Sequence, residues 1–266
     1  LLEKEKKRFA GTELVGRTLG VVGLGAIGSI IANSALDLGM NVIGYDPAIS
    51  VEAAWQLSSR VKRMDSLEQL LAVADYVTLH VPAIPETKHL INSKSLGLMK
   101  KTAKILNFAR EEIVSADDML AALNAGALAG YISDFPAPNL LGRKDVLLMP
   151  HIGASTEEAE ENCAVMAVDQ LKDFLENGNI YNSVNYPRTR MSRNGGSRIT
   201  FSNDNVPKVL GSVLSVLADS NLNIIDMVNK SRGEVAYNII DIEGDVSQTV
   251  KDSIAKVNGV MGVRVL

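Results

Sequence analysis

Cysteine, histidine and tryptophan are scarce in this chain. Among its 266 residues there are one cysteine, Cys163, three histidines and one tryptophan. A single cysteine forms no internal disulfide, which fits a reducing cytosol, and it excludes a metal site built from several cysteines. We therefore expect no metal site, and any imidazole chemistry must use His80, His89 or His151.

The chain also has no excess of positive charge and no long hydrophobic run. Its formal net charge is −4, which argues against binding nucleic acid through the phosphate backbone. No apolar run reaches the roughly 18 residues that a membrane span needs. We therefore expect a cytoplasmic protein that binds neither nucleic acid nor membrane. Its content of 46% hydrophobic and 22% charged residues is typical of a globular chain.

Short apolar runs alternate with amphipathic stretches between residues 18 and 150. Strands that are almost wholly apolar and are separated by helices are typical of a parallel sheet covered on both faces. The sequence therefore predicts a Rossmann-type, doubly wound α/β domain. The expected strands are 18–23, 41–45, 75–81, 103–109, 128–133 and 146–150.

The pattern changes at both ends of this region. Residues 1–12 resemble the tail of a helix whose beginning is absent, and residues 13–153 form the α/β domain. A Ser/Thr start, a run of glutamates and a closing glycine predict a long helix within 154–181. Residues 182–197 are polar, with an excess of arginine, and we interpret them as a solvated linker. Residues 198–266 follow the order β-α-β-β-α-β of a small ferredoxin-like domain.

A glycine-rich loop joins the first expected strand to the helix after it. "GVVGLGAIG" contains the pattern G-x-G-x-x-G as Gly23, Gly25 and Gly28. In this context the first glycine permits a tight turn, the second lets the backbone approach a pyrophosphate, and the third lets helix and strand pack closely. The amides of Ala26 and Ile27 would then lie at the helix N-terminus, which favours a phosphate.

An acidic residue follows the second expected strand, in "GYDP". Asp46 lies 18 positions after Gly28, close to the spacing of about 20 at which a carboxylate binds the adenosine ribose of a dinucleotide. A carboxylate there would repel a 2′-phosphate, so NAD is preferred over NADP. The alternative is that Asp46 only begins an Asp-Pro turn.

Three motifs in this order, "GLGAIG", "NFAR" and "PHIGAST", resemble the D-isomer-specific 2-hydroxyacid dehydrogenases. The resemblance runs from about residue 13 to 180 and implies hydride transfer between NAD and a 2-hydroxy acid. The last domain resembles an ACT regulatory domain. Together they imply oxidation of 3-phosphoglycerate to 3-phosphohydroxypyruvate, the first step of serine biosynthesis. The family's substrate domain comes mainly from residues before the nucleotide domain, which this sequence does not contain, and the long helix is expected to return to it.

The resemblance also implies two catalytic residues. His151, in P-H-I-G, would take the proton of the C2 hydroxyl while hydride leaves C2, and would return it in the reverse direction. Arg110, in N-F-A-R, would hold the substrate carboxylate through its planar guanidinium. The alternatives are a solvated histidine at a strand end and a surface arginine paired with Glu111 or Glu112.

Further residues are implied to contact the cofactor. Asp134, in "GYISDFPAP", matches the aspartate that accepts a hydrogen bond from the nicotinamide carboxamide, with an ordinary strand-end turn as the alternative. His80 matches a segment on the adenosine side and is otherwise structural, whereas His89 is expected to be exposed. The complete set is Gly23, Gly25, Ala26, Ile27, Gly28, Asp46, His80, Val81, Pro82, Phe108, Ala109, Arg110, Asp134, His151, Gly153 and Ala154.

One partner of the histidine is missing from its usual place. The resemblance implies a glutamate three residues after Asp134 that hydrogen-bonds the catalytic histidine, and the chain has Ala137 there. Either another carboxylate reaches His151 from elsewhere in the fold, or His151 acts alone. Glu157 and Glu158 are near in sequence, which by itself shows no contact.

The C-terminal domain implies a regulator. ACT domains bind small effectors between paired copies, so serine is the implied effector and a homo-oligomer, dimer or tetramer, the implied assembly. Asn203, Asn205 and Asn223 align with effector contacts, and Lys208 replaces a glycine in the same turn. These asparagines could instead be turn residues only. Two other functions remain open: another D-2-hydroxyacid dehydrogenase, such as one for hydroxypyruvate, and a non-catalytic NAD-binding or serine-sensing protein.

Overall fold

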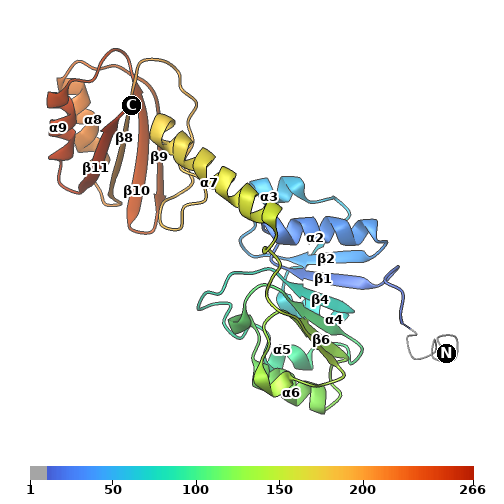
Figure 1. The fold of residues 1–266 in the computed structure, drawn as a ribbon. Helices are drawn as coiled ribbons and strands as arrows, with labels where there is room; N and C mark the ends of the chain where they lie inside the picture. Colours follow the sequence, from blue (N-terminus) through green and yellow to red (C-terminus); the bar gives the residue numbers. More distant parts are fainter. Residues whose placement is uncertain (1–10) are drawn as a thin grey trace. The chain divides into compact units, whose positions relative to one another are not determined.

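The computed structural model describes residues 11–266, whose course Figure 1 shows. The chain divides into two compact units, Leu1–Gly153 and Ala154–Leu266. The helix tail predicted for residues 1–12 lies outside the described residues except for its last two, which are in no helix. None of the described helices is both long and apolar enough to cross a bilayer.

The first unit is built on a parallel sheet of seven strands in the order β3-β2-β1-β4-β5-β6-β7. Figure 1 labels β2, β1, β4 and β6 of this sheet. Every neighbouring pair is parallel, so the predicted Rossmann-type α/β fold is confirmed. The strand order reverses between β1 and β4, the place where folds of this kind bind ligands at the carboxyl ends of their strands. The strands are β1 (Thr18–Val22), β2 (Asn41–Tyr45), β3 (Lys62–Arg63), β4 (Tyr76–Leu79), β5 (Lys104–Asn107), β6 (Gly130–Ser133) and β7 (Val146–Leu148).

Helices connect these strands, and capping side chains fix where several of them begin. Ser50, Ser66, Asn92 and Ser115 each accept a hydrogen bond from a backbone N–H of the first turn, which satisfies donors that a helix leaves unpaired. The helices are α2 (Ala26–Asp37), α3 (Val51–Gln56), α4 (Leu67–Val73), α5 (Ser93–Gly97) and α6 (Ala116–Asn124), with 3-10 segments η2 (Glu111–Ile113) and η3 (Pro138–Leu140). The core they cover is fully buried at its centre, which includes Leu70, Leu71, Val77, Leu79, Ile105 and Met119.

Apart from β2, the observed strands are shorter than the predicted runs. The run 75–81 becomes Tyr76–Leu79, and the run 103–109 becomes Lys104–Asn107, because each apolar run continues past the sheet into the loop that follows. Strand β3 is not among the predicted elements. It consists of two exposed charged residues at the edge of the sheet, which give no apolar pattern.

The second unit begins with helix α7 (Glu157–Asn177), where the Thr156 hydroxyl accepts from the Ala159 amide at 3.1 Å. Gly178 ends the helix with a φ of 72°. A four-stranded antiparallel sheet follows, in the order β11-β8-β10-β9. Its elements have the ferredoxin-like order: β8 (Ser197–Asp204), α8 (Val209–Asp219), β9 (Ile224–Arg232), β10 (Val235–Ile242), α9 (Gln248–Ala255) and β11 (Val260–Val265).

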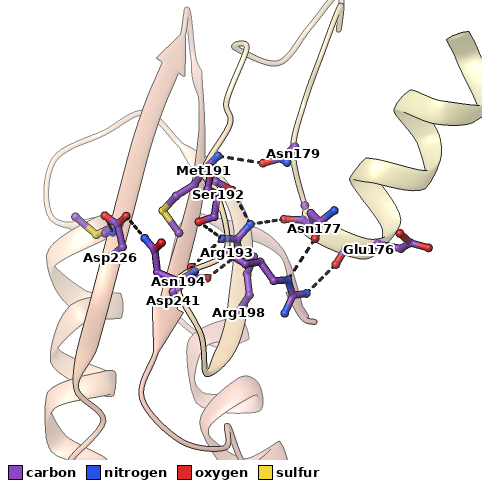
Figure 2. Close-up of polar contacts among 12 residues, drawn as sticks. Glu176, Asn177, Asn179, Met191, Ser192, Arg193, Asn194, Arg198, Asp226 and Asp241 are labelled. Atoms are coloured by element: carbon purple, nitrogen blue, oxygen red, sulfur yellow. Dashed lines mark hydrogen bonds and ion pairs between the residues drawn. The ribbon is translucent and has the colours of Figure 1, made fainter.

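The segment predicted as a solvated linker is exposed at most of its positions, but three of its side chains, Pro187, Thr189 and Met191, are buried in this unit. Thr189 is 1% and Met191 8% exposed, and Thr189 exchanges two backbone hydrogen bonds with Ile180. The buried guanidinium of Arg198 donates to the carbonyls of Met191 and Ser192, at 2.9 and 3.0 Å, as Figure 2 shows. Composition alone does not reveal these buried positions, because the buried cation that binds the backbone of the segment lies outside it.

The last turn of α7 is bound by side chains of the same unit. Carbonyls at a helix C-terminus have no partner within the helix, and cationic donors there also complement the helix dipole. These contacts fix that end of α7 to the second unit, and the expected return of the helix to a substrate domain stays a prediction. The donors, at 2.7–3.0 Å, are Arg264 to Phe174 and Leu175, Arg193 to Glu176, Arg198 to Asn177, and the Tyr237 hydroxyl to Gly178.

Lys208 has a backbone conformation that a glycine adopts at lower cost. It stands just before α8 with a φ of 78°, in the left-handed region, where a Cβ costs about 1–2 kcal/mol. A glycine relieves this strain but loses more backbone entropy on folding, which offsets part of the gain. We therefore expect Lys208→Gly to stabilise the second unit by roughly 0.5–1 kcal/mol. Thermal unfolding checks this. Lys208→Ala removes the same charge but keeps the Cβ, so an equal gain from both variants would assign the effect to charge instead.

Candidate active site

The residues singled out in the sequence lie where the strands of the first sheet end, along the edge formed by their carboxyl ends. The glycine loop follows β1, Asp46 follows β2, and His80 follows β4, while Arg110, Asp134 and His151 follow β5, β6 and β7. Parallel strands have their carboxyl ends along one edge, which is where open α/β sheets bind ligands. Because these strands are consecutive neighbours in the sheet, the edge is continuous.

The glycine loop is shaped by close backbone approaches. Gly23 has a φ of 89°, and a Cβ there would lie 2.6 Å from the carbonyl oxygen of His80. A Cβ on Gly28 would overlap the carbonyl oxygen of Gly23. At Gly25, by contrast, no atom lies within 4 Å of where a Cβ would stand, and no side chain caps α2. The first amides of this helix are therefore open to an anion.

Asp46 holds this loop in place. Its Oδ2 accepts from the Leu24 amide at 2.8 Å, and its Oδ1 accepts from the Ala48 amide at 2.9 Å. The bond to Ala48 belongs to the Asp-Pro turn, and the bond to Leu24 ties the glycine loop to the end of β2. A carboxylate can accept about four hydrogen bonds, so the half-buried Asp46 has capacity left for a ribose hydroxyl.

Gly28→Ala is expected to weaken dinucleotide binding on the order of 100-fold. The added methyl group overlaps the Gly23 carbonyl, so α2 has to move away from β1 and the pyrophosphate loses charge-assisted hydrogen bonds from its amides. A fluorescence titration with NADH measures the affinity. Gly97→Ala serves as the control, because nothing lies within 4 Å of a Cβ there. An unchanged affinity in Gly28→Ala would contradict the role of the loop.

Of the two histidines other than His151, His80 is held in the fold and His89 is exposed. The Nε2 of His80 lies 2.9 Å from the Thr78 hydroxyl oxygen. Burial lowers the pKa of His80, which keeps its ring neutral near pH 7. Next to it, Val81 is half-buried and Pro82 is exposed. His89 is exposed in a turn, as the sequence suggests.

A buried asparagine that sequence reasoning did not single out positions Arg110. The side-chain amide of Asn107 donates to the Arg110 carbonyl at 2.9 Å, and its Oδ1 accepts from the Ala109 amide at 3.2 Å. The Arg110 guanidinium is exposed and donates to the Ala109 carbonyl at 2.6 Å. Within the described part of the chain it pairs with no carboxylate, Glu111 and Glu112 included. The place of Asn107 at the end of an apolar run is the signal that could have found it.

The same asparagine joins the loops after β5 and β6. The Ser133 hydroxyl donates to the Asn107 carbonyl at 3.0 Å, and the Asn107 amide donates to the Tyr131 hydroxyl at 3.4 Å. Burial raises the pKa of Tyr131, so its phenol stays neutral. The loops that carry Arg110 and Asp134 are therefore held by one buried network.

His151 and Asp134 are in contact. The Nδ1 of His151 lies 3.0 Å from the Oδ2 of Asp134, and the imidazole packs on the Phe135 ring with centroids 4.9 Å apart. The His151 side chain is 56% exposed and that of Asp134 is 11% exposed. The other oxygen, Oδ1 of Asp134, is buried without a hydrogen-bond partner. Since buried polar atoms normally have partners, this orphan indicates a place for a donor from a ligand.

This contact answers a question that the sequence leaves open. Another carboxylate does reach His151, and it is Asp134, which the sequence assigns to the cofactor alone. Ala137 is 8% exposed and packs in the hydrophobic core of the unit, so its surroundings suit no carboxylate.

Comparison with known proteins identifies the family. Residues 2–153 match the family model described as "D-isomer specific 2-hydroxyacid dehydrogenase, NAD binding domain". The chain belongs to the D-isomer-specific 2-hydroxyacid dehydrogenase family. The resemblance found in the sequence is thereby confirmed, and so is NAD as the cofactor of this domain.

Relatives named D-3-phosphoglycerate dehydrogenase match most of this chain. The one from Methanocaldococcus jannaschii is 35% identical over 90% of the chain and 46% of its own length. The one from Escherichia coli K12 is 32% identical over 98% of the chain and 66% of its own length. The chain spans about half the length of several curated relatives that it matches.

Solved structures of other 2-hydroxyacid dehydrogenases share the fold. D-mandelate dehydrogenase from Rhodotorula graminis aligns with a TM-score of 0.58 and 32% identity, over 65% of this chain and 52% of that one. D-2-hydroxyisocaproate dehydrogenase aligns with a TM-score of 0.58 and 31% identity, over 67% of this chain and 61% of that one. Their names cover different 2-hydroxy acids, so the fold alone does not select a substrate.

The residues of this 2-hydroxyacid dehydrogenase chain fit NAD at two places. Gly25 leaves the approach to the α2 amides open, as a pyrophosphate requires. The orphaned Oδ1 of Asp134 is a buried acceptor, and the nicotinamide carboxamide is a donor. Phe108 at the end of β5 is 38% exposed, and Gly153 and Ala154 are exposed after His151; these three stay predicted contacts.

The three asparagines predicted to bind an effector are each engaged within the second unit. Asn203 is 3% exposed, and its Oδ1 accepts from Asn238 at 2.7 Å. Asn205 and Asn223 each donate to a neighbouring acceptor at 3.0 Å. The first two precede α8 whereas Asn223 follows it. One copy of this unit therefore does not bring the three together.

Proposed function

We propose that the protein oxidises 3-phosphoglycerate to 3-phosphohydroxypyruvate with NAD. The observation that carries the proposal is the pair formed by His151 and Asp134, 3.0 Å apart, at the same sheet edge as the glycine loop. The names of relatives matched over most of the chain support the substrate. Because the chain spans about half of several relatives, the activity is proposed for the complete product of its gene.

Residues of the first unit would hold NAD along this edge. Ala26 and Ile27 present helix amides to the pyrophosphate beside Gly25, where space is open. Asp46 would accept from the adenosine ribose hydroxyls, and its charge would repel a 2′-phosphate. When bound, NAD supplies the acceptor for hydride at its nicotinamide ring.

His151 would move the proton of the reaction. Its Nδ1 faces Asp134, which leaves Nε2 as the base on the free edge of the ring. Nε2 takes the proton of the C2 hydroxyl as the C2–H bond breaks. The bonding pair leaves C2 as hydride, and the C2–O bond becomes a carbonyl. In the reverse direction the imidazolium returns the proton to the forming alkoxide.

Arg110 would bind the carboxylate of the substrate. Its guanidinium is exposed just beyond β5 and, among the described residues, has no carboxylate partner. A planar guanidinium binds a carboxylate through two parallel N–H groups, and its positive charge also polarises the neighbouring C2 oxygen.

The test is NADH formation from 3-phosphoglycerate, D-glycerate and D-lactate, on this chain and on the longest product of its gene. We expect 3-phosphoglycerate to be oxidised most efficiently. A preference for D-glycerate or D-lactate would instead mean that the protein is a dehydrogenase of another D-2-hydroxy acid. The solved relatives that are named for other acids support this alternative. Binding of NADH without oxidation of any of the three would indicate a non-catalytic NAD-binding protein.

For the second unit we infer an ACT-like regulatory domain that binds serine between copies of the chain. Its ferredoxin-like order supports this. The separation of Asn223 from Asn203 and Asn205 by α8 means that a site using all three needs a second copy. Calorimetric titration with serine and sedimentation of the oligomer test it. A monomer that gives no heat with serine would contradict it.

A further inference from the structure

The second unit contains a cavity that the proposed function does not use. It has a volume of about 500 Å³ and lies between the last turns of α7, the segment that follows this helix, and the strands β8, β10 and β11. Pockets that bind small molecules typically enclose roughly 300–1,000 Å³ and combine apolar walls with a few polar groups. Both the size and the lining of this cavity therefore suit a small molecule.

The cavity lies on the face of the second sheet that α8 and α9 do not cover. Along β8, Ile199 and Phe201 pack with buried side chains of both helices in one hydrophobic core. Thr200 and Ser202 alternate with them and line the cavity. Asn203, an expected effector contact, comes next in the alternation and does not line it. The cavity is therefore separate from the inferred serine site.

Aromatic rings form much of the cavity wall. They come from α7, the segment after it and β10, and include Phe174, Tyr181, Tyr186 and Tyr237. The rings of Tyr186 and Tyr237 meet edge to face with centroids 5.9 Å apart, and the Tyr237 hydroxyl donates to the Gly178 carbonyl at 2.8 Å. These walls are in place without a ligand, and they favour a flat ring, which can stack on them or meet them edge to face.

The cavity wall also carries a cation. Among the described residues that line it, Arg264 of β11 is the one charged side chain. Its guanidinium donates to the carbonyls of Phe174 and Leu175, at 3.0 and 2.8 Å, and its Cζ lies 4.6 Å from the centroid of the Phe174 ring. A guanidinium has more N–H donors than these two contacts use. Within the described part of the chain no carboxylate pairs with it.

The charge of Arg264 is only partly compensated by the end of α7. The C-terminus of a helix is equivalent to roughly −0.5 elementary charge, which is less than the charge of a guanidinium. The nearby carboxylate of Asp173 does not line the cavity and accepts from Asn177 and Asn179 at 2.8–3.1 Å. The cavity therefore favours an anionic group, and its described lining offers an ammonium group no carboxylate.

We propose that this cavity binds an aromatic carboxylate that has no amino group. The ring of the ligand lies among the aromatic side chains, and its carboxylate accepts hydrogen bonds from the N–H groups of Arg264 that α7 leaves free. Charge-assisted bonds of this kind fix orientation as well as adding affinity. The site does not depend on the proposed oxidation of 3-phosphoglycerate, because every residue that carries it belongs to the second unit.

Calorimetric titration of the whole chain with 3-phenylpropanoate tests the class of ligand. Its analogue 3-phenylpropan-1-ol lacks the carboxylate, phenylalanine adds an ammonium group, and hexanoate lacks the ring. We expect each analogue to bind about tenfold more weakly than 3-phenylpropanoate, or not at all, because each loses one of the matched contacts. Absence of binding by 3-phenylpropanoate, or equal binding by any analogue, overturns the proposal.

Gly262→Val locates the site. Gly262 pairs with Ser202 across the sheet, and the Ser202 hydroxyl oxygen, at 3.9 Å, is the one atom within 4 Å of a Cβ placed there. The added side chain therefore occupies cavity space without a clash, and valine suits a strand. We expect affinity for 3-phenylpropanoate to fall about tenfold or more while the melting temperature stays near that of wild type. An unchanged affinity would place the ligand elsewhere, such as at Arg110, and overturns the proposal.

Ser231→Val is the matched control for this substitution. It adds a similar apolar group at an exposed position of β9 that does not line the cavity. Affinity for 3-phenylpropanoate should stay within about twofold of wild type. A loss equal to that of Gly262→Val would mean that bulk anywhere on the sheet suffices, which contradicts a site in this cavity.

Arg264→Gln tests the role of the cation. Glutamine keeps an N–H donor for the α7 carbonyls but has no charge, so we expect the preference for 3-phenylpropanoate over 3-phenylpropan-1-ol to fall about tenfold. The alcohol needs only the apolar walls, and its affinity should change by less than about twofold, which shows that the cavity persists. A preference for the acid that Arg264→Gln leaves intact overturns the proposal.

Discussion

Asp241→Asn is expected to destabilise the second unit by about 3–5 kcal/mol. Arg198 and Asp241 are 0% and 1% exposed. Two hydrogen bonds join them, from Nε to Oδ1 at 2.6 Å and from Nη2 to Oδ2 at 2.8 Å. The substitution leaves the guanidinium buried without its counter-charge, and the neutral amide cannot accept both bonds. Because Arg198 also binds the segment before β8 (Figure 2), its misplacement would release that segment.

The same pair makes the stability of this unit depend on pH in acid. Burial acts to raise the pKa of Asp241, but hydrogen bonds from Arg198 and from the Asn194 amide outweigh it and lower the pKa below its ordinary value. A lowered pKa in the folded state contributes stability that is fully present above the unfolded pKa, near 3.9, and is lost as pH falls through the folded pKa. We therefore expect the unit to lose stability below about pH 4. In Asp241→Asn the part of this loss that comes from protonation of Asp241 should be absent.

Hydrogen exchange of the whole chain measures both effects. Amides of β8 and β10 should exchange about two to four powers of ten faster in Asp241→Asn, whereas those of β1 and β4 should keep their rates. Asp226→Asn is the control, because Asp226 accepts a hydrogen bond from Asn194 at 2.8 Å and has no contact with Arg198. It should change stability by less than about 1 kcal/mol. Unchanged exchange in Asp241→Asn would show that the buried ion pair is dispensable.

His151→Asn is expected to lower kcat by about 10²–10⁴-fold while NADH binding stays nearly unchanged. An asparagine amide can still donate to Asp134, so the buried carboxylate keeps a partner, but it cannot accept the proton of the substrate hydroxyl at neutral pH. This expected fall in kcat equals the rate enhancement that a general base typically supplies. Steady-state rates with 3-phosphoglycerate and a fluorescence titration with NADH separate turnover from binding.

His89→Asn is the matched control for this substitution. His89 is exposed in a turn with a φ of 49°, a conformation that asparagine adopts readily, so kcat should stay within about twofold of wild type. A rate for His151→Asn near that of wild type would exclude His151 as the base. Equal losses in both variants would point to damage to the fold rather than to the chemistry.

The parallel sheet could be predicted because burial on both faces requires strands that are apolar throughout. Runs such as 41–45 meet that requirement, and their apolar composition can be recognised in the sequence. The observed β2 has the same bounds as this run. Strand β3 could not be predicted, since Lys62 and Arg63 join the sheet only through backbone pairing with β2 at its edge. The buried positions within the segment 182–197 could not be predicted, because the partner of its backbone, the Arg198 guanidinium, is buried by strands from elsewhere in the chain.

The sequence by itself determined the family, the cofactor and the order of the site residues along the sheet edge. Each of these depends on local spacing: a glycine loop between strand and helix, and polar residues where apolar runs end. Only the tertiary structure decided which side chains meet. Asp134 and His151 follow neighbouring strands and are 3.0 Å apart, and Asn107 holds the loops of Arg110 and Asp134. Contacts across strands depend on sheet order and loop path, which the spacing of residues along the chain does not contain.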